Sequence, residues 1–242
     1  MKIALALHGL FNSTQDLSSR GDDGYNHIKK HILDKGDVDV FIHSWEVDKK
    51  EMIESLYKPV KSTFEPQIDF LPLVKERKLD KLPNPPRKPE TILSHLYSVT
   101  EAMKLVYQSR KKYDVVIKAR FDLGRINRQT SGPHNQTNPY PVQCINFNPL
   151  IDKNKIYMAD WQYFKQGPAD MWFYGSSEIM SKFKDLYNSL YDNMYVGSKL
   201  HDFAMSMEGN PGDLSNAVIF YKFWMMSCGL WENKVALETF WE

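Results

Sequence analysis

The sequence predicts an α/β fold built on an open, mixed, mostly parallel sheet flanked by helices. Two observations lead to this prediction. Apolar, strand-like runs alternate with helical patterns in the first half of the chain, and the second half mixes the two kinds of element. A strand–helix–strand order implies parallel pairing through a right-handed crossover. With 242 residues, the chain is long enough for one such domain with a full core.

In the first half, the run at residues 2–8 is apolar throughout and closes on glycine, as a strand buried on both faces does. Repeated prolines between residues 66 and 89 predict an irregular excursion. A long amphipathic pattern then predicts a helix that leads directly into a strand. The predicted strands lie at residues 2–8, 38–45, 60–64 and 114–119, and the predicted helices at 25–35, 51–56 and 90–112.

The second half is less regular. Residues 127–139 are rich in turn-forming residues and predict a loop. Ser176 or Ser177 is expected to cap a helix that follows the last predicted strand. The predicted strands lie at residues 142–147, 156–158 and 171–175, and a final helix is predicted over 213–226.

Charge and cysteine content narrow the classes of function. The 31 Lys and Arg residues balance the 30 Asp and Glu residues, so we expect no nucleic-acid partner. Two distant cysteines favour a reducing compartment over a disulfide scaffold or a cysteine-based zinc site. The apolar run at the start is too short for a secretion signal, and no stretch approaches the ~20 apolar residues of a transmembrane segment. We therefore expect a soluble, cytoplasmic protein with no signal peptide.

The end of the strand at 114–119 is the most informative segment. Its apolar start gives way to Lys118, Arg120 and Asp122, which a period of two places on one side of the strand. Buried charges without partners are costly, so we expect this tip to emerge into a polar site. A carboxylate there can hold a divalent cation, and an arginine beside it can bind phosphate oxygens. A structural salt bridge between Arg120 and Asp122 is an equally good interpretation of the spacing alone.

Three segments carry a resemblance. Residues 2–9 read KIALALHG, residues 39–45 read DVFIHSW, and residues 113–123 read YDVVIKARFDL. In this order they resemble a family of glycosyltransferases from bacterial surface-polysaccharide clusters, large DNA viruses and phages. Its members share a first strand ending in glycine, a DVFIHTW-like second strand and an R-x-D-L strand end. The resemblance covers roughly residues 1–191 and depends on the three short motifs occurring together.

The resemblance implies a Rossmann-like, GT-A-type fold, in which a nucleotide-diphosphate sugar lies across the strand ends and Mn²⁺ or Mg²⁺ bridges the diphosphate. One domain, 1–242, would then comprise a nucleotide-binding half (1–124) and an acceptor-side half (125–242). Asp122 would be the metal ligand of a degenerate Asp-x-Asp motif whose second acidic position is Gly124. The residues implied to bind the nucleotide sugar are His8, Gly9, Asn12, His43, Ser94, Lys118 and Arg120.

A transferase also needs a catalytic base where the acceptor hydroxyl loses its proton. Asp160 and Asp170 are the two candidates, because both flank an aromatic run. The segments at 160–162 and 173–175 resemble the acidic, glutamine-bearing segment and the F-x-x-G strand of the same family. A turn residue is an equally good interpretation of Asp170.

The leading hypothesis is a glycosyltransferase of polysaccharide biosynthesis that moves a sugar from a nucleotide-diphosphate donor to a glycan or lipid-linked acceptor, in the cytoplasm of a bacterium or an infected host cell. The alternative is a nucleotide- or glycan-binding protein on the same fold without turnover. Gly124 favours the alternative, because a second carboxylate is missing there. Asp122 then either holds the metal together with water and diphosphate, or no metal binds. Another phosphate-handling enzyme is disfavoured, since the sequence has no GxxxxGK[ST] loop.

Overall fold

One mixed sheet of seven strands organises the chain, in the order β3-β2-β1-β4-β6-β5-β7. The computed structural model describes residues 1–11, 21–124, 144–161, 165–208 and 214–238. The strands are β1 (Lys2–Gly9), β2 (Asp37–Ser44), β3 (Lys61–Phe64), β4 (Val115–Arg120), β5 (Ile156–Ala159), β6 (Trp172–Ser176) and β7 (Lys234–Leu237). The predicted α/β class with an open, mostly parallel sheet is confirmed.

The strand directions bring most carboxyl ends to one edge of the sheet. β1 pairs in parallel with β2 and β4, and β2 pairs in parallel with β3. β6 is antiparallel to both β4 and β5, while β5 is parallel to β7. All strands except β6 therefore end at the same edge, and β6 begins there. We call this the carboxyl edge.

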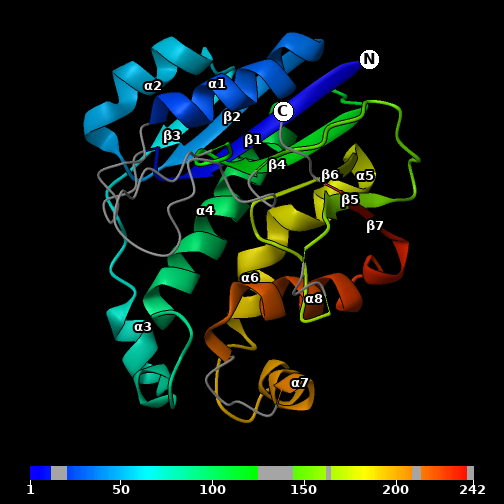
Figure 1. Ribbon diagram of the computed structural model, residues 1–242. Coiled ribbons are helices and arrows are strands. Elements are labelled where there is room, and N and C mark those ends of the chain that lie inside the picture. The colour runs from blue at the N-terminus through cyan, green and yellow to red at the C-terminus, as the bar shows by residue number, and fades with distance from the viewer. Residues whose placement is uncertain (12–20, 125–143, 162–164, 209–213, 239–242) are drawn as a thin grey trace, which may run out of the picture.

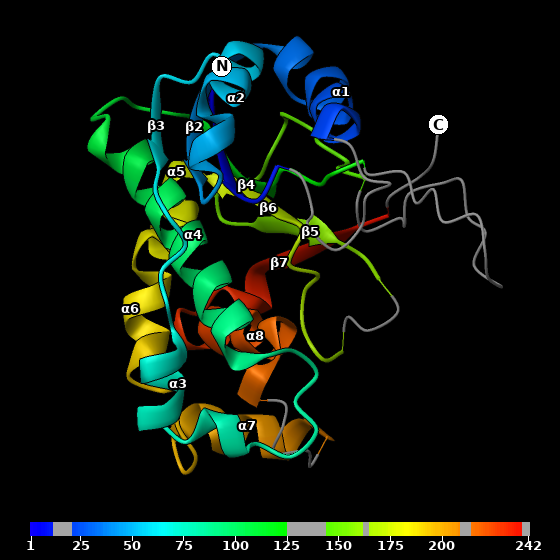
Figure 2. The same cartoon turned by 90° about the vertical axis from the view of Figure 1, so that its left-hand side faces the viewer.

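Helices cover both faces of the sheet (Figures 1 and 2). They are α1 (Gly21–His31), α2 (Lys50–Tyr57), α3 (Leu71–Glu76), α4 (Pro89–Gln108), α5 (Ser177–Met180), α6 (Leu186–Tyr191), α7 (Lys199–Glu208) and α8 (Ala217–Ser227). α1 and α2 lie on one face, and α4, α6 and α8 lie on the other. Within the described ranges, no helix is both long enough and apolar enough to cross a membrane.

α4 begins with Pro89 in its first turn, a position where the missing N–H costs nothing. Its apolar residues recur every three or four positions and are buried against the sheet, as the amphipathic pattern predicted: Ile92, Leu96, Val99, Met103 and Val106. The polar residues of α4 that accompany this stripe, His95 and Ser98, reach the carboxyl edge and become part of the site described below.

Several elements differ from the prediction. α3, α7 and β7 were not predicted, and the last helix starts after an Asn216 cap, while residues 209–213 lie outside the described residues. The predicted strand at 142–147 is wrong over residues 144–147, which form no ladder. Here side chains bind the backbone instead: the Ile145 N–H donates to His27 Nε2 at 3.1 Å, and the Asn148 N–H donates to the Tyr174 hydroxyl at 3.3 Å.

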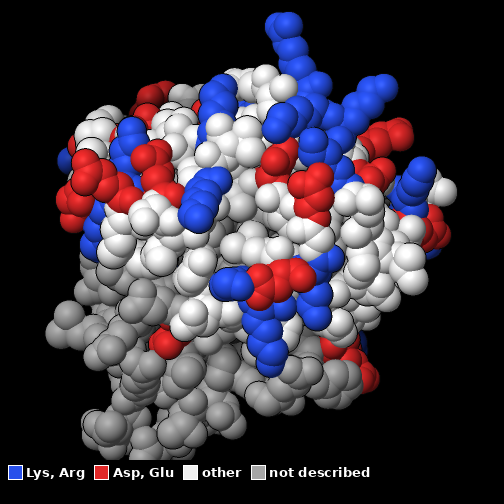
Figure 3. Space-filling model, turned by 90° about the horizontal axis from the view of Figure 1, so that it is seen from above, with Lys and Arg blue, Asp and Glu red and all other residues white. Residues whose placement is uncertain are grey.

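The surface above α1 and α2 carries charges of both signs. Lys and Arg side chains are interspersed with Asp and Glu side chains on this face (Figure 3). Neither sign of charge forms a separate patch over the described residues of this face.

Candidate functional site

Three neighbouring strands place polar side chains side by side on the α4 face. His8 of β1 pairs in register with His43 of β2 on one side and with Arg120 of β4 on the other. We call His43, His8 and Arg120 the polar row. One pleat earlier, the same face carries Ala6, flanked by Phe41 and Lys118. Open α/β sheets bind ligands outside the carboxyl ends of their strands, which is where this row lies.

Arg120 holds two carboxylates. Its Nε and Nη2 donate to the two oxygens of Asp122 at 2.8 and 2.6 Å, and its Nη1 donates to Asp170 at 2.9 Å. Asp122 follows β4 and Asp170 precedes β6, so the antiparallel pairing brings both to the carboxyl edge. Three of the five guanidinium N–H groups are thus used by described residues. The side chain is 32% exposed, so the other two can donate to a ligand oxygen.

Asp170 is an ionised carboxylate with reduced basicity. Burial alone would raise its pKa, but the charges of Arg120 and Lys118 outweigh burial and hold the pKa of Asp170 well below its usual range. A general base works best when its pKa lies near the working pH. In this arrangement Asp170 is therefore better suited to orient Arg120 than to take a proton.

Lys118 lies one pleat below Arg120 and is fully buried. Its ammonium donates to the backbone carbonyl of Asp170 and lies 4.9 and 5.2 Å from the ring centroids of Phe173 and Tyr221. Burial lowers the pKa of Lys118 to about 7, although the carboxylate of Asp170 acts in the opposite direction. A direct contact between Lys118 and a nucleotide sugar requires the ammonium to leave this position.

His95 and Tyr221 complete the cluster, and the sequence analysis did not identify either residue. Nε2 of His95 lies 2.8 Å from the Tyr221 hydroxyl and 3.8 Å from the Asp170 carboxylate. Burial lowers the pKa of His95 to about 3, so its imidazole is neutral. The only signal for His95 was its position next to Ser94. Tyr221 lies in so apolar a segment that it is indistinguishable from core residues by pattern.

His8 occupies the centre of the polar row without a hydrogen bond. Its side chain is 1% exposed, and within the described part of the chain neither ring nitrogen has a partner. The ring of His95 packs edge-on against it, with centroids 5.2 Å apart. Burial lowers the pKa of His8 well below its usual value, and the nearby charges of Lys118 and Arg120 lower it further. Buried polar groups nearly always have partners, so His8 is an exception that needs a reason.

His43, at the other end of the row, has a partner on each ring nitrogen. Its Nε2 lies 2.9 Å from Glu65, and its Nδ1 lies 2.8 Å from the Ser98 hydroxyl. Burial lowers the pKa of His43, so the ring carries one proton. A carboxylate only accepts, so this proton is on Nε2 and Ser98 donates to Nδ1.

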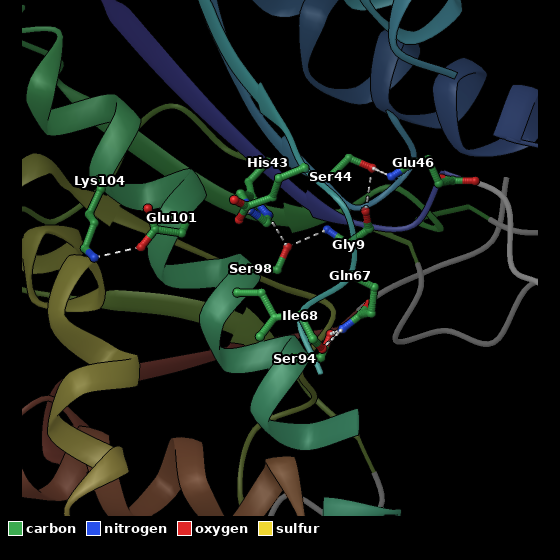
Figure 4. Close-up of polar contacts among 11 residues, drawn as sticks. Gly9, His43, Ser44, Glu46, Gln67, Ile68, Ser94, Ser98, Glu101 and Lys104 are labelled. Atoms are coloured by element: carbon green, nitrogen blue, oxygen red, sulfur yellow. Dashed lines mark hydrogen bonds and ion pairs between the residues drawn. The ribbon is translucent and has the colours of Figure 1, made fainter. Parts of the chain in front are cut away.

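The same chain of bonds holds the end of β1. Ser98 accepts the Gly9 N–H at 3.0 Å, and the Ser44 hydroxyl donates to the Gly9 carbonyl at 2.9 Å (Figure 4). Gly9 has a φ of +95°, in the left-handed region that favours glycine. The predicted residue Gly9 is therefore clamped on both sides at the carboxyl edge.

The remaining predicted residues are spread out. Ser94 is half-buried on α4, where its hydroxyl accepts from Gln67 Nε2 at 2.8 Å. Asp160 follows β5 and is exposed at the carboxyl edge, where its carboxylate makes no hydrogen bond or ion pair to described residues. Asn12 lies outside the described residues.

The residues around Asp122 do not fit a metal ion well. Both of its oxygens accept from Arg120, and its side chain is 15% exposed. No group of three or more His, Cys, Asp or Glu residues that could hold a metal ion occurs among the described residues. The residues of this site therefore do not suit a divalent cation bound by Asp122.

Gly124, at the second acidic position of the implied motif, has a structural reason to be glycine. Its φ is +69°, and a Cβ there would lie 2.1 Å from the Cβ of His27. A carboxylate at this position would require helix α1, which carries His27, to move away from the strand end. The absence of a second acidic residue thus follows from close packing.

The structure brings together six of the predicted site residues around the carboxyl ends of β1, β2 and β4: His8, Gly9, His43, Lys118, Arg120 and Asp122. Asp170 joins them through Arg120. Comparison with protein-family models finds no match for this chain, and comparison with curated proteins finds none either.

Proposed function

We propose that the protein is a glycosyltransferase that uses a nucleotide-diphosphate sugar and acts in the cytoplasm on a glycan or lipid-linked acceptor. The observation that supports this most is Arg120: a guanidinium at the carboxyl end of a parallel strand, oriented by two carboxylates and still a third exposed. The mixed, mostly parallel sheet is compatible with the GT-A type. Fold alone does not define an activity, so the proposal depends on the site.

Arg120 suits the chemistry of the leaving group. Glycosyl transfer breaks the bond between the anomeric carbon and the diphosphate, and negative charge develops on the departing phosphate oxygens. Donors already aligned toward such charge stabilise it without reorganisation. The two N–H groups that Arg120 does not use for Asp122 and Asp170 are such donors, held by carboxylates that fix the guanidinium plane.

Asp160 suits the role of base. The acceptor hydroxyl must lose its proton as the new glycosidic bond forms. The Asp160 carboxylate lies exposed at the carboxyl edge and is bound to no described residue, whereas Asp170 is engaged by Arg120. We therefore assign proton acceptance to Asp160 and the orientation of Arg120 to Asp170.

A second candidate is a nucleotide- or glycan-binding protein without turnover. It is favoured by the same packing that excludes a carboxylate at position 124 and by the closed pair of Asp122 and Arg120. Binding would persist in such a protein, but the donor would be neither transferred nor hydrolysed.

A thermal-shift panel tests the proposal. Nucleoside diphosphates and their sugars, with and without Mn²⁺, should raise the melting temperature if one of them binds the native state. Arg120→Met should abolish that rise, while Lys111→Met, which removes an ion pair with Asp39 near the amino end of β2, should keep it. Absence of stabilisation by every nucleotide under every metal condition would refute the transferase proposal. Donor hydrolysis, lost in Asp160→Asn, separates an enzyme from a binding protein.

A further inference from the structure

His8 is distinguished from the other buried histidines by its lack of partners. His27 accepts from a backbone N–H, His43 is bonded on both nitrogens, and His95 is bonded to Tyr221. His8 is as deeply buried as His43 and more deeply than His27 or His95, yet neither of its nitrogens has a partner in the described ranges. An unsatisfied buried polar group costs about 1–3 kcal/mol. A fold that needed only volume at this position would be more stable with an apolar ring.

The chemistry of this imidazole selects a class of ligand. Burial and the adjacent cations lower the pKa of His8, so the ring stays neutral and offers one donor and one acceptor. A hydroxyl group also offers one donor together with acceptor lone pairs, so the two match. A phosphate oxygen offers only acceptors and would leave the basic nitrogen of His8 facing negative charge.

The surroundings separate an exposed entrance from a buried interior, where the Lys118 ammonium is bound to the Asp170 carbonyl and the imidazoles of His8 and His95 are neutral. Arg120 and Asp170 are 32% and 26% exposed, whereas His95 is 14% exposed and His8 is 1% exposed. An anionic group of a ligand meets Arg120 first. A neutral part of the same ligand can extend past it toward the two imidazoles.

We propose that His8, with His95 beside it, forms a subsite that binds a neutral hydroxyl of the sugar carried by the donor, while Arg120 binds the diphosphate. The inference deepens the proposed function and rests on it. His8 lies at the most deeply buried end of the subsite. Because the ring of His95 packs edge-on against His8, the subsite requires that ring to turn aside for the hydroxyl to enter. The subsite thus discriminates sugars by the position of a hydroxyl rather than by charge.

Calorimetric titration of two variants tests the subsite. His8→Phe keeps a planar aromatic ring, somewhat larger than imidazole, but removes both nitrogens, and His8→Gln restores a donor and an acceptor. The probes are UDP, GDP and dTDP, each compared with its glucose, galactose, mannose or N-acetylglucosamine conjugates. His8→Phe should lower the affinity for the cognate nucleotide sugar by about tenfold, the effect of one hydrogen bond, and leave the nucleoside diphosphate alone unchanged. His8→Gln should recover part of the loss.

The outcomes distinguish a failure of the hydroxyl subsite from a failure of the proposed transferase function. An equal loss for the sugar conjugate and the bare diphosphate, or no loss for either, overturns the hydroxyl subsite while leaving the transferase intact. If no nucleotide binds the wild-type protein, both ideas fail together. Melting temperatures separate binding from folding, because His8→Phe should melt at or above the wild-type temperature. A second readout is the ¹⁵N shift of the His8 and His95 ring nitrogens, which should move with the sugar conjugate and not with the bare diphosphate.

Discussion

The two faces of the sheet differ most at the carboxyl edge, although the same strands supply both. Toward α1 and α2 the strand ends bury apolar side chains, with Phe121 packed against Phe11 and Tyr57 at centroid distances of 5.9 and 5.6 Å. Toward α4 and α8 the neighbouring positions carry the polar row. Because successive side chains of a strand alternate between faces, one short segment serves both environments.

Both faces of the sheet bury an apolar core, but they differ at the carboxyl edge. There the α1 face stays apolar and tightly packed. The α4 face instead contains charges and imidazoles, whose burial is unfavourable unless they are partnered. Arg120 and His43 have their partners, and His8 does not. The predictions below ask whether the two faces separate as cleanly in experiment.

Removing the ring of Phe121 should have the largest effect. Phe121→Ala deletes a fully buried aromatic side chain and should lower the free energy of unfolding by about 3–5 kcal/mol. Urea denaturation measures the loss, and Phe121→Leu, which keeps more of the volume, is the milder control. Nucleotide affinity per folded molecule should stay unchanged, and a loss of affinity would show that the apolar face also shapes the site.

Arg120→Met should have the second largest effect on stability. It leaves the carboxylates of Asp122 and Asp170 close together without their shared cation, which should cost about 2–3 kcal/mol of stability. Unlike Phe121→Ala, it should also abolish nucleotide-dependent stabilisation. Arg120→Lys keeps the charge but not the planar fork and should recover only part of both losses. Full recovery with lysine would mean that charge alone, not orientation, matters here.

Replacing the neighbouring residues His43 and His8 by phenylalanine should affect the free energy of unfolding differently. His43→Phe leaves Ser98 and Glu65 without their partner and should cost about 2 kcal/mol in chemical denaturation. His8→Phe removes no hydrogen bond and should cost nothing or stabilise. If both variants are equally destabilised, the contrast within the polar row does not hold.

The smallest effect concerns pH. His8, His27 and His95 have pKa values below the ordinary 6.5 in the folded protein, mainly because of burial. The unfolded chain therefore takes up protons that the folded chain does not, and stability is lost as the pH falls below 6.5. Each such histidine accounts for about 1.4 kcal/mol between pH 7.5 and 5.5.

His8→Phe should reduce this pH dependence by one histidine's share when urea denaturation is repeated at pH 7.5, 6.5 and 5.5. The carboxylate of Asp170 does not interfere in this range. Its pKa is lowered in the folded protein, so its contribution is lost only as the pH falls below the ordinary 3.8. An unchanged pH profile in the variant would mean that His8 is already protonated or solvated in the folded protein.

Hydrophobic periodicity predicted those strands and helices whose buried residues recur at a regular spacing. The strands at 2–8, 38–45 and 114–119 and the long helix after Pro89 are confirmed, because each has one dominant period. α3 and β7 were not predicted, since each is short and its burial depends on distant partners. The strand predicted at 142–147 was wrong over the described residues 144–147, because His27 and Tyr174 bind the backbone there instead of a neighbouring strand.

The site residues also fall into two groups: those that a local pattern predicted and those that only the fold brings together. Arg120 and Asp122 are two residues apart, so the strand period alone indicated that they lie together. Asp170, 50 residues further along, was a candidate base, yet its bond to Arg120 depends on the antiparallel pairing of β4 and β6. His95 and Tyr221 are 126 residues apart and meet only because α4 and α8 pack on one face.

By itself, the sequence determined the open α/β sheet and the polar tip of β4, because alternation and burial act over neighbouring residues. Only the tertiary structure decided which partners these residues have. Sheet register set His8 between His43 and Arg120, and helix packing brought His95 against His8. Close approach of α1 excluded a carboxylate at Gly124. β1, β2 and β4 are parallel strands joined by long crossover connections, so no short turn fixes their register, and packing depends on residues far apart in the sequence.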